Sequence, residues 1–348
     1  MNKDQLKLAD VAKRAGVAVS TVSRVVNGSS LVSTELRQRI ELIIETMGYK
    51  PVPMEKRKGV RKEQWPWLKH RMLKTVIFGP YDLFWITNYA PIYAYALHGV
   101  EEQVGHFQLR RAVDRAETSR ALIDVLERGD ADGSLILNTG TQPLPTEIAS
   151  YPVVVFMGTH PDLACDRVIP NSRRAGNLAA EYLLKKGCRS GIAIGGESAV
   201  YRERTDSFRA RLADQGIESA EIHQPAIIRG GAHVHQANRA VVSKELLPLL
   251  RKMPRPFGIF SIMDIVTPAV YAELATAGLK IGTDVHVVSC NNERPYLDQL
   301  QPQPAVIDTR ADYIGRRAVR QLMQRLEFPA TPHEKVQIEP QLIEPELA

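Results

Sequence analysis

The chain has 348 residues, of which 44% are hydrophobic and 24% are charged, a composition typical of globular proteins with a sizeable core. It contains no run of 18 or more apolar residues and no apolar segment near its N-terminus, so we expect neither a membrane-spanning nor a secreted protein. The net charge of +6 is uneven, because residues 1–62 carry +7 and the remainder carries −1. An excess of positive charge at the N-terminus favours a polyanionic partner there.

Residues 8–47 predict three short helices. The first has an apolar stripe at helical spacing, followed by Gly16 as a stop, because a helix C-terminus favours a residue that adopts positive φ. The second begins at Ser20 or Val19. The third runs from about Thr34 to Met47, with Ser33 as its N-cap. The inward-facing residues expected on the first two helices are Leu8, Val11, Ala12, Ala15, Val22, Val25 and Val26.

The outer face of the second helix is short and polar. It carries Ser20, Thr21, Ser23 and Arg24. Two helices at a sharp corner, braced by a third, form a helix-turn-helix unit whose second helix fits the major groove of DNA. An arginine such as Arg24 can donate two hydrogen bonds to a guanine edge, which contributes about 1–3 kcal/mol of discrimination. The alternative is a three-helix bundle that makes only protein contacts.

The stretch "LKLADVAKRAGVAVSTVSRVVNGSSLVSTELRQRIELIIETMGYKP" resembles the headpiece of the lactose/galactose repressor (LacI/GalR) family. The resemblance implies a homodimer, possibly a tetramer, that reads a pseudo-palindromic operator in double-stranded DNA. By position it implies base contacts from Val19, Ser20 and Arg24. The remaining residues of the implied DNA-binding set are Leu8, Thr21, Ser23, Asn27 and Ser33, the last four as phosphate contacts.

The linker at residues 51–72 departs from that family. Relatives have a short hinge helix whose leucine wedges into the minor groove, whereas this chain has Lys58 at the leucine position. The segment is basic and is interrupted by Gly59 and Pro66. Trp65 or Trp67 could act as the apolar wedge, but packing on the following domain is the stronger expectation. We therefore expect a headpiece at 1–50, an atypical basic hinge at 51–72 and a large domain at 73–348.

The large domain alternates between apolar strands and helices, which predicts parallel sheets covered on both faces and ligand binding at the carboxyl ends of the strands. The resemblance implies two α/β lobes of the periplasmic-binding-protein type that close on a small molecule. The expected strands are 74–79, 133–138, 152–157, 191–196, 257–263, 285–290 and 305–309. The expected helices are 90–104, 117–129, 172–187, 201–215, 233–252, 264–277 and 311–327.

No catalytic, metal or cofactor site is expected. The chain has neither a G-x-x-x-x-G-K-[ST] phosphate loop nor a G-x-S-x-G elbow. His233 and His235 are two residues apart, so a helix would point them to different faces. Three scattered cysteines indicate buried thiols in a reducing cytoplasm, and these are Cys165, Cys188 and Cys290.

The resemblance also implies effector-binding residues, with departures from the family pattern. The family arginine is Arg204, and only the aspartate of the usual N-D pair remains, as Asp264. The usual F-D-D is Cys290-Asn291-Asn292, so two carboxylates have become amides, which changes the hydrogen bonds available to a sugar. The full set of implied effector-binding residues is Phe84, Trp85, Asn171, Arg204, Asp264 and Asn291.

Two of these assignments have structural alternatives: Phe84 and Trp85 as lobe core, and Arg204 as a salt-bridge residue. Together the features predict a cytoplasmic DNA-binding transcriptional regulator, and they favour a repressor over an activator. Its small-molecule effector would be a sugar or sugar derivative. The alternatives are an activator or co-repressor-dependent regulator of the same family, or a solute-binding protein without DNA function.

Overall fold

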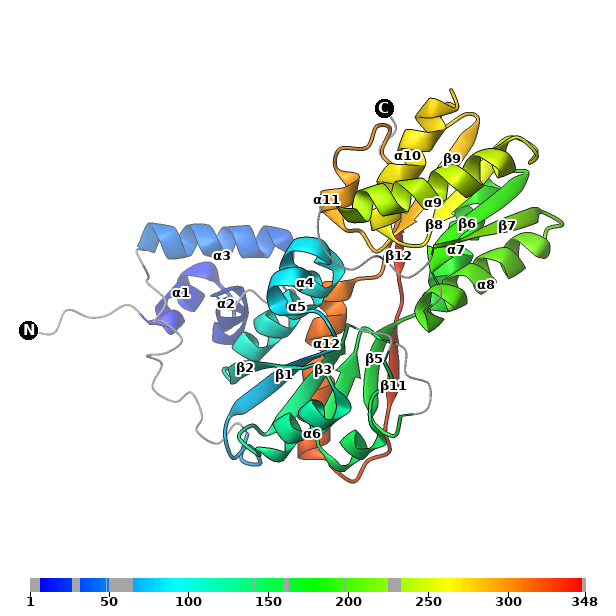
Figure 1. Cartoon of the computed structure of the whole chain (residues 1–348). Coiled ribbons are helices and arrows are strands. Elements are labelled where there is room, and N and C mark those ends of the chain that lie inside the picture. The colour runs from blue at the N-terminus through cyan, green and yellow to red at the C-terminus, as the bar shows by residue number, and fades with distance from the viewer. Residues whose placement is uncertain are drawn as a thin grey trace, which may run out of the picture. The chain divides into compact units, whose positions relative to one another are not determined.

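The computed structural model describes residues 7–26, 32–47, 49, 65–139, 142–158, 163–196, 198–224 and 233–345. The chain divides into a unit of residues 1–66, called the headpiece below, and a unit of residues 67–348, called the effector unit. Figure 1 labels the helices and strands as they are named here. Within the described ranges, no helix combines the length and the apolarity needed to cross a membrane.

The headpiece confirms the three predicted helices, α1 (Leu8–Ala15), α2 (Val19–Val26) and α3 (Thr34–Met47). Gly16 ends α1 with a φ of 67°, the left-handed conformation that glycine adopts without steric cost. The Ser33 hydroxyl accepts a hydrogen bond from the Leu36 amide at the start of α3. A shared core joins the helices and contains Val11, Ala12, Ala15, Val22, Val25, Val32 and Ile40.

The effector unit contains two lobes, each built on one six-stranded sheet. The N-lobe sheet is parallel throughout, with the order β11-β5-β4-β3-β1-β2. Its strands are β1 (Met72–Phe78), β2 (Arg110–Ala116), β3 (Gly133–Asn138), β4 (Val153–Phe156), β5 (Asp166–Pro170) and β11 (Lys335–Ile338). Its helices are α4 (Leu83–Tyr89), α5 (Pro91–His106), α6 (Ser119–Glu127), the 3-10 helix η2 (Thr146–Ser150) and α12 (Ala311–Glu327).

Helices cover both faces of the N-lobe sheet. Successive strand residues point to opposite faces, and Val76, Phe78 and Ile136 share one core with Leu122 and Val125 of α6. Helix α12 packs on β3, β4 and β5 and against α5. The apolar character of these strands therefore follows from burial on both sides, as expected for a parallel sheet.

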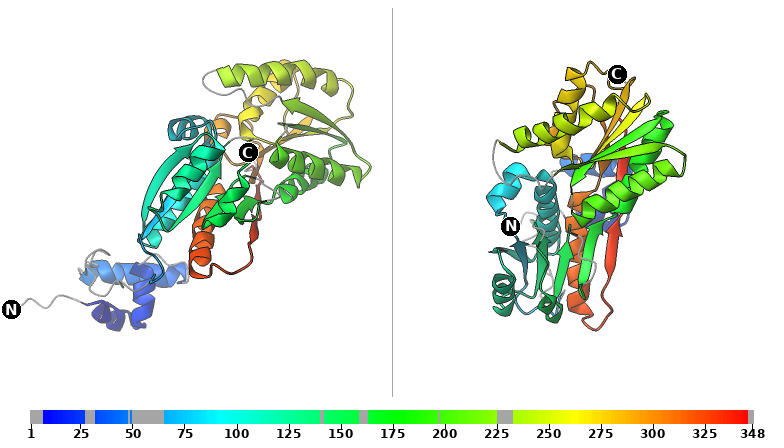
Figure 2. Two further views of the ribbon diagram at one scale, coloured as in Figure 1. Left: turned by 60° about the horizontal axis from the view of Figure 1, so that its bottom comes forward. Right: turned by 45° about the vertical axis from the view of Figure 1, so that its right-hand side comes forward.

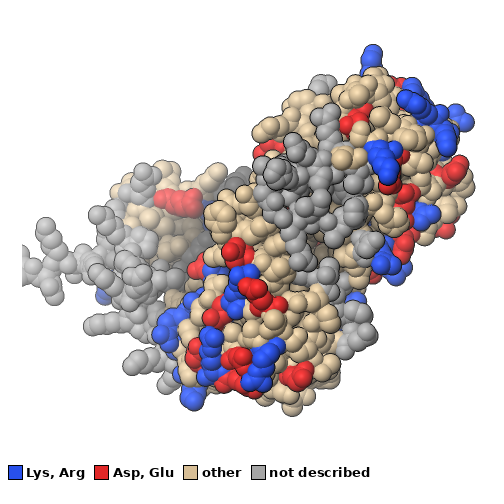
Figure 3. Space-filling model, viewed as in Figure 1, with Lys and Arg blue, Asp and Glu red and all other residues tan. Residues whose placement is uncertain are grey.

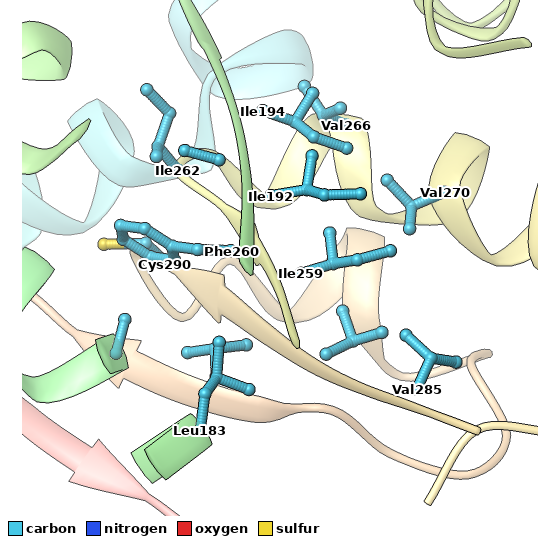
Figure 4. Close-up of a cluster of buried hydrophobic side chains, with 14 of the residues drawn as sticks. Leu183, Ile192, Ile194, Ile259, Phe260, Ile262, Val266, Val270, Val285 and Cys290 are labelled. Atoms are coloured by element: carbon cyan, nitrogen blue, oxygen red, sulfur yellow. The ribbon is translucent and has the colours of Figure 1, made fainter. Parts of the chain in front are cut away.

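The C-lobe repeats this architecture with the sheet order β12-β10-β9-β8-β6-β7, in which only the β10–β12 pair is antiparallel. Figure 4 shows part of its core, where Ile192, Ile259 and Phe260 from neighbouring strands meet Leu183 and Val270 from helices. The strands are β6 (Ser190–Gly196), β7 (Glu218–Gln224), β8 (Phe257–Ser261), β9 (Val285–Cys290), β10 (Ala305–Asp308) and β12 (Gln341–Ile343). The helices are α7 (Ser172–Lys185), α8 (Ala199–Ala213), α9 (His233–Leu250), η3 (Asp264–Val266), α10 (Thr267–Thr276) and α11 (Arg294–Leu297).

The chain passes between the lobes three times, at residue 171, at residues 309–310 and at residues 339–340. The last passage carries β11 of the N-lobe into β12 of the C-lobe, and Figure 2 shows it as the red end of the chain. Because both lobes contain segments from distant parts of the sequence, neither lobe is a continuous stretch of chain.

The expected two-lobed α/β fold with parallel sheets is confirmed, but several strands were not predicted. The strands β2 and β7 lie at sheet edges and carry charged residues, so their sequences lack the apolar run that is typical of a buried strand. The other strands that were missed are short or contain charges and proline: β5, β11 and β12. Helix α4 was also missed, and the expected helix 264–277 divides into η3 and α10.

Candidate functional sites in the headpiece and between the lobes

Helix α2 presents two different faces. Val22 and Val25 are buried in the headpiece core, whereas Ser20 and Arg24, one helical turn apart, are both exposed. Val19 at the start of the helix is 47% exposed. The structure thus brings Val19, Ser20 and Arg24 together on one accessible face.

The other expected DNA contacts differ in their placement. Thr21 and Ser23 are half-buried on α2, and Leu8 is half-buried at the start of α1. Ser33 is exposed, but its hydroxyl already accepts the Leu36 amide at the α3 N-terminus. Asn27 and the hinge residues 51–64 lie outside the described residues.

The end of the expected hinge is tied to the N-lobe. The Asp132 carboxylate accepts hydrogen bonds from the backbone amides of Lys69, His70 and Met72, at 2.6, 2.8 and 3.0 Å. Trp67 is half-buried and Leu68 is buried in the same stretch. One carboxylate therefore fixes the point at which the chain enters the effector unit.

A polar cluster occupies the carboxyl ends of the C-lobe strands, where a parallel sheet is expected to bind ligands. Asp264 follows β8, and Arg204 lies on α8, which follows β6. Ser289 is the penultimate residue of β9, and Asn291 and Glu293 follow that strand. All five side chains are buried, although all are polar or charged. We call these five residues the polar cluster. The structure brings together three of the expected effector-binding residues, Arg204, Asp264 and Asn291.

Arg204 is held by neutral partners. One terminal nitrogen of its guanidinium donates to the Ile262 carbonyl at 2.8 Å and to the Asn291 amide oxygen at 3.0 Å. Within the described ranges, no carboxylate lies within ion-pair distance of this guanidinium, and its Nε has no hydrogen-bond partner although it is buried. Arg204 thus acts on Asp264 and Glu293 by charge but not through an ion pair at contact distance within the described ranges. Its unpartnered Nε leaves capacity for a ligand.

The pKa values of the two carboxyl groups of the cluster are raised to different degrees. Asp264 accepts the Ser289 hydroxyl and, at 2.6 Å, the Glu293 backbone amide, which partly offsets the rise in its pKa caused by burial. Burial and the nearby Asp264 charge both raise the pKa of Glu293. Burial likewise raises the pKa of the Cys290 thiol to about 12. All three cysteines are buried free thiols, as predicted.

Aromatic side chains of both lobes surround the cluster. Trp85 stacks on Tyr81 with 3.6 Å between ring centroids, and burial near Tyr201 and Glu293 raises the pKa of Tyr93. Phe84, in contrast, is 71% exposed, so it belongs neither to the lobe core nor to a described contact of the cluster. Of the two expected stacking residues, only Trp85 makes a ring contact among the described residues.

Asn171 lies apart from the cluster at the first passage between the lobes. Its amide oxygen caps α7 by accepting the Arg174 amide at 3.0 Å, and its amide nitrogen donates to Glu339 at 2.7 Å. Asn171 therefore links two of the three interlobe segments. The sequence did not predict Ser289, Glu293, Tyr93 or Tyr201, although the rule that ligands bind after strand ends covers the region of Ser289 and Glu293.

The surface charge of the effector unit is mixed. Figure 3 shows basic and acidic side chains interspersed over the visible face of the N-lobe. Exposed pairs such as Arg115–Glu117 at 3.0 Å and Arg120–Asp124 at 2.8 Å account for part of this mixture. No single sign dominates this face, in agreement with the sequence, which concentrates positive charge in residues 1–62.

Comparisons with known proteins match both units. Residues 7–52 match the model of bacterial regulatory proteins of the lacI family, and residues 180–345 match that of a periplasmic binding protein-like domain. The ribose operon repressor of Haemophilus influenzae is 25% identical, with 96% of each chain covered. The transcriptional repressor PurR of Escherichia fergusonii is 26% identical, covering 97% of this chain and 95% of the relative. A structure of the regulator CelR with cellobiose has a TM-score of 0.65 at 21% identity, covering 99% and 100% of the two chains, which shows the shared fold.

Proposed function

Because this chain belongs to the lacI family of bacterial regulatory proteins, we propose that it is a sequence-specific DNA-binding repressor of transcription whose operator affinity is set by a small molecule. The observation that carries the proposal is the accessible face of α2, where Ser20 and Arg24 stand opposite the buried Val22 and Val25. Such a helix can enter the major groove while the other two helices hold it in place.

In this proposal Val19, Ser20 and Arg24 contact base edges, and Val19 offers only an apolar contact of the kind made with a thymine methyl group. The phosphate contacts come from Thr21, Ser23, Asn27 and Ser33, with Leu8 beside them. Two headpieces of a homodimer read the two halves of a pseudo-palindromic operator, since one α2 spans only one half-site.

The effector in this proposal is a sugar or sugar derivative bound between the lobes. One relative is named a ribose operon repressor, and the CelR structure is a complex with cellobiose. The polar cluster supports a hydroxylated ligand, because the buried Nε of Arg204 has no partner. The Asn291 oxygen and amide nitrogen each keep one further hydrogen-bonding position beyond their bonds to Arg204 and Glu293. Trp85 and Tyr81 supply an apolar stacking surface.

Selection from a randomised duplex pool with the full chain tests the DNA part of the proposal. We expect enrichment of one two-fold symmetric sequence, bound with an affinity that falls steeply with salt at a slope of about −0.9 per phosphate contacted. Arg24→Ala should lower the preference for the enriched sequence. A pool without enrichment would contradict the proposal.

Thermal unfolding of the full chain with D-ribose, D-cellobiose and a panel of other sugars tests the effector part. A ligand at 100 times its Kd stabilises the protein by about 2.7 kcal/mol. Arg204→Gln should abolish that stabilisation and leave binding of the enriched duplex unchanged. An unchanged sugar response in Arg204→Gln would remove Arg204 from the site.

A further inference from the structure

Two contacts join the lobes beside the polar cluster, and both come from the C-lobe segment 293–296. The Glu293 carboxylate accepts a hydrogen bond from the Ile92 backbone amide of the N-lobe at 3.0 Å. The Tyr296 hydroxyl donates to the Tyr89 carbonyl at 3.1 Å. On the N-lobe side, the Ile92 amide that donates and the Tyr89 carbonyl that accepts both lie at the junction of α4 and α5.

The Ile92 amide needs an acceptor from outside its own helix. Pro91 at the start of α5 has no N–H, and the amides of Tyr93 and Ala94 donate to the Ala90 carbonyl. Among the described residues, Glu293 is the only acceptor for the Ile92 amide, one of the first-turn donors that a helix leaves unsatisfied. Separation of the lobes would expose this amide.

Opposing influences act on the charge of Glu293: burial and Asp264 disfavour it, whereas the Ile92 and Asn291 amides and Arg204 favour it. The Glu293 side chain is only 4% exposed, and its other oxygen accepts the Asn291 amide at 3.2 Å. The titratable groups that face Glu293 are Arg204, Asp264, Cys290, Tyr93, Tyr95, Tyr201 and Tyr296.

We propose that Glu293 is a positioning residue of the effector site, a latch that holds the two lobes closed through the N-terminus of α5 and that takes up a proton as it closes. Arg204 is the only cation in this group, and it is bound to neutral acceptors. The nearby Asp264 repels a second negative charge, and water that would hydrate Glu293 is excluded. An open unit would return the carboxylate to water and release the proton.

The sign of the pH dependence follows from the difference between the pKa of Glu293 in the closed unit and its pKa in the open unit. Burial and the Asp264 charge raise the pKa of Glu293 in the closed unit to about 7, above its ordinary value of 4.5. They outweigh the hydrogen bonds from the Ile92 and Asn291 amides and the Arg204 charge, all of which favour the carboxylate. Closure is therefore most favourable at low pH and is lost as the pH rises through the higher value. Between pH 6 and pH 8 the equilibrium between closed and open forms should shift by about tenfold.

The latch itself does not depend on the proposed function, but its consequence for operator affinity does. A ligand that replaces the Ile92 amide or the Asn291 amide as the partner of Glu293 would change the closed population. The same binding site would then respond to pH and to effector together. Experiments on the ligand-free, DNA-free full chain separate the two proposals.

Hydrogen exchange resolved at the Ile92 amide tests the latch directly. After correction for intrinsic exchange, we expect the protection of this amide to fall about tenfold from pH 6 to pH 8 in the wild-type chain. Glu293→Gln keeps an acceptor but no titrating group, so protection should stay high at both pH values. Tyr296→Phe is the matched control: it removes the other interlobe bond, so protection should fall while the pH dependence remains.

Spin labels on the two lobes provide the second measurement. The three native cysteines are buried, so labels at Arg120→Cys of α6 and Lys280→Cys after α10, both exposed positions, report the distance between lobes. The short-distance population should be larger at pH 6 than at pH 8, and equal at both pH values in Glu293→Gln. A wild-type pH dependence in Glu293→Gln, or a wild-type distribution that does not change with pH, would overturn the proposal.

Discussion

Two glycines on helix α5 should respond in opposite directions to the same substitution. Helix α5 crosses α12 so closely that a Cβ built on Gly99 would lie 1.9 Å from the Asp312 carbonyl oxygen and 2.7 Å from its carbon. Gly315 of α12 makes the reciprocal approach to the Ala96 carbonyl, at 2.0 Å. A Cβ on Gly105 of the same helix would meet nothing within 4 Å.

The expected magnitudes follow from what surrounds each glycine. The atoms near Gly99 are helix backbone, which cannot rotate away, so Gly99→Ala must push α5 and α12 apart. We expect a loss of about 3 kcal/mol in the free energy of unfolding, the upper part of the usual range for overpacking. Gly105→Ala restricts only the unfolded chain and should raise stability by about 0.5–1 kcal/mol.

Urea denaturation followed by tryptophan fluorescence measures both effects. Trp65, Trp67 and Trp85 are all the tryptophans of the chain, and two of them lie in the effector unit close to or within the N-lobe. Gly99→Ala should also lower the protection of the Ile92 amide, because α5 carries both residues. Equal stability of the two variants would refute the close packing of α5 on α12.

Further predictions concern single side chains. Asp132→Ala leaves three backbone amides without their acceptor and should cost about 1–3 kcal/mol in urea denaturation; wild-type stability would show that water replaces the carboxylate. Arg325→Met removes the guanidinium whose Nε lies 2.6 Å from the carboxylate of the fully buried Asp166. The free energy of unfolding in urea should fall by about 3–5 kcal/mol, and an unchanged value would contradict a stabilising ion pair. Ser33→Ala should destabilise the headpiece by about 1 kcal/mol in thermal melts monitored by circular dichroism, and an unchanged melt would remove Ser33 as the α3 cap.

The headpiece could be predicted almost completely because its signals are local. The spacing of Val11, Ala12 and Ala15, the stop at Gly16 and the cap at Ser33 each determine a feature within one helical turn. Most interior strands of the effector unit were also predicted, since burial on both faces leaves an apolar run. The interior strand β5 was missed, because Asp166 and Arg167 occupy its first two positions. The edge strands β2 and β7 escaped because one side of each borders solvent and tolerates charge.

The site between the lobes could be predicted only in part. Arg204 and Asn291 were expected from the family pattern. In the structure a terminal guanidinium nitrogen of Arg204 donates to the Asn291 amide oxygen at 3.0 Å. Glu293 could not be found in that way, because the expected family pattern assigns no role to position 293 and its partner Ile92 lies 201 residues away in the sequence. Asn171 has a structural role between interlobe segments that sequence position alone does not reveal.

The most direct test of the account compares the Kd of the full chain for its selected duplex with the Kd for a shuffled duplex of equal composition, at physiological salt. The account predicts that the selected duplex binds at least about 10³-fold more tightly. Arg24→Ala should reduce this ratio by about 1–3 kcal/mol, since one pair of hydrogen bonds to a base is lost. Equal affinity for both duplexes would contradict the assignment of α2 as a base-reading helix.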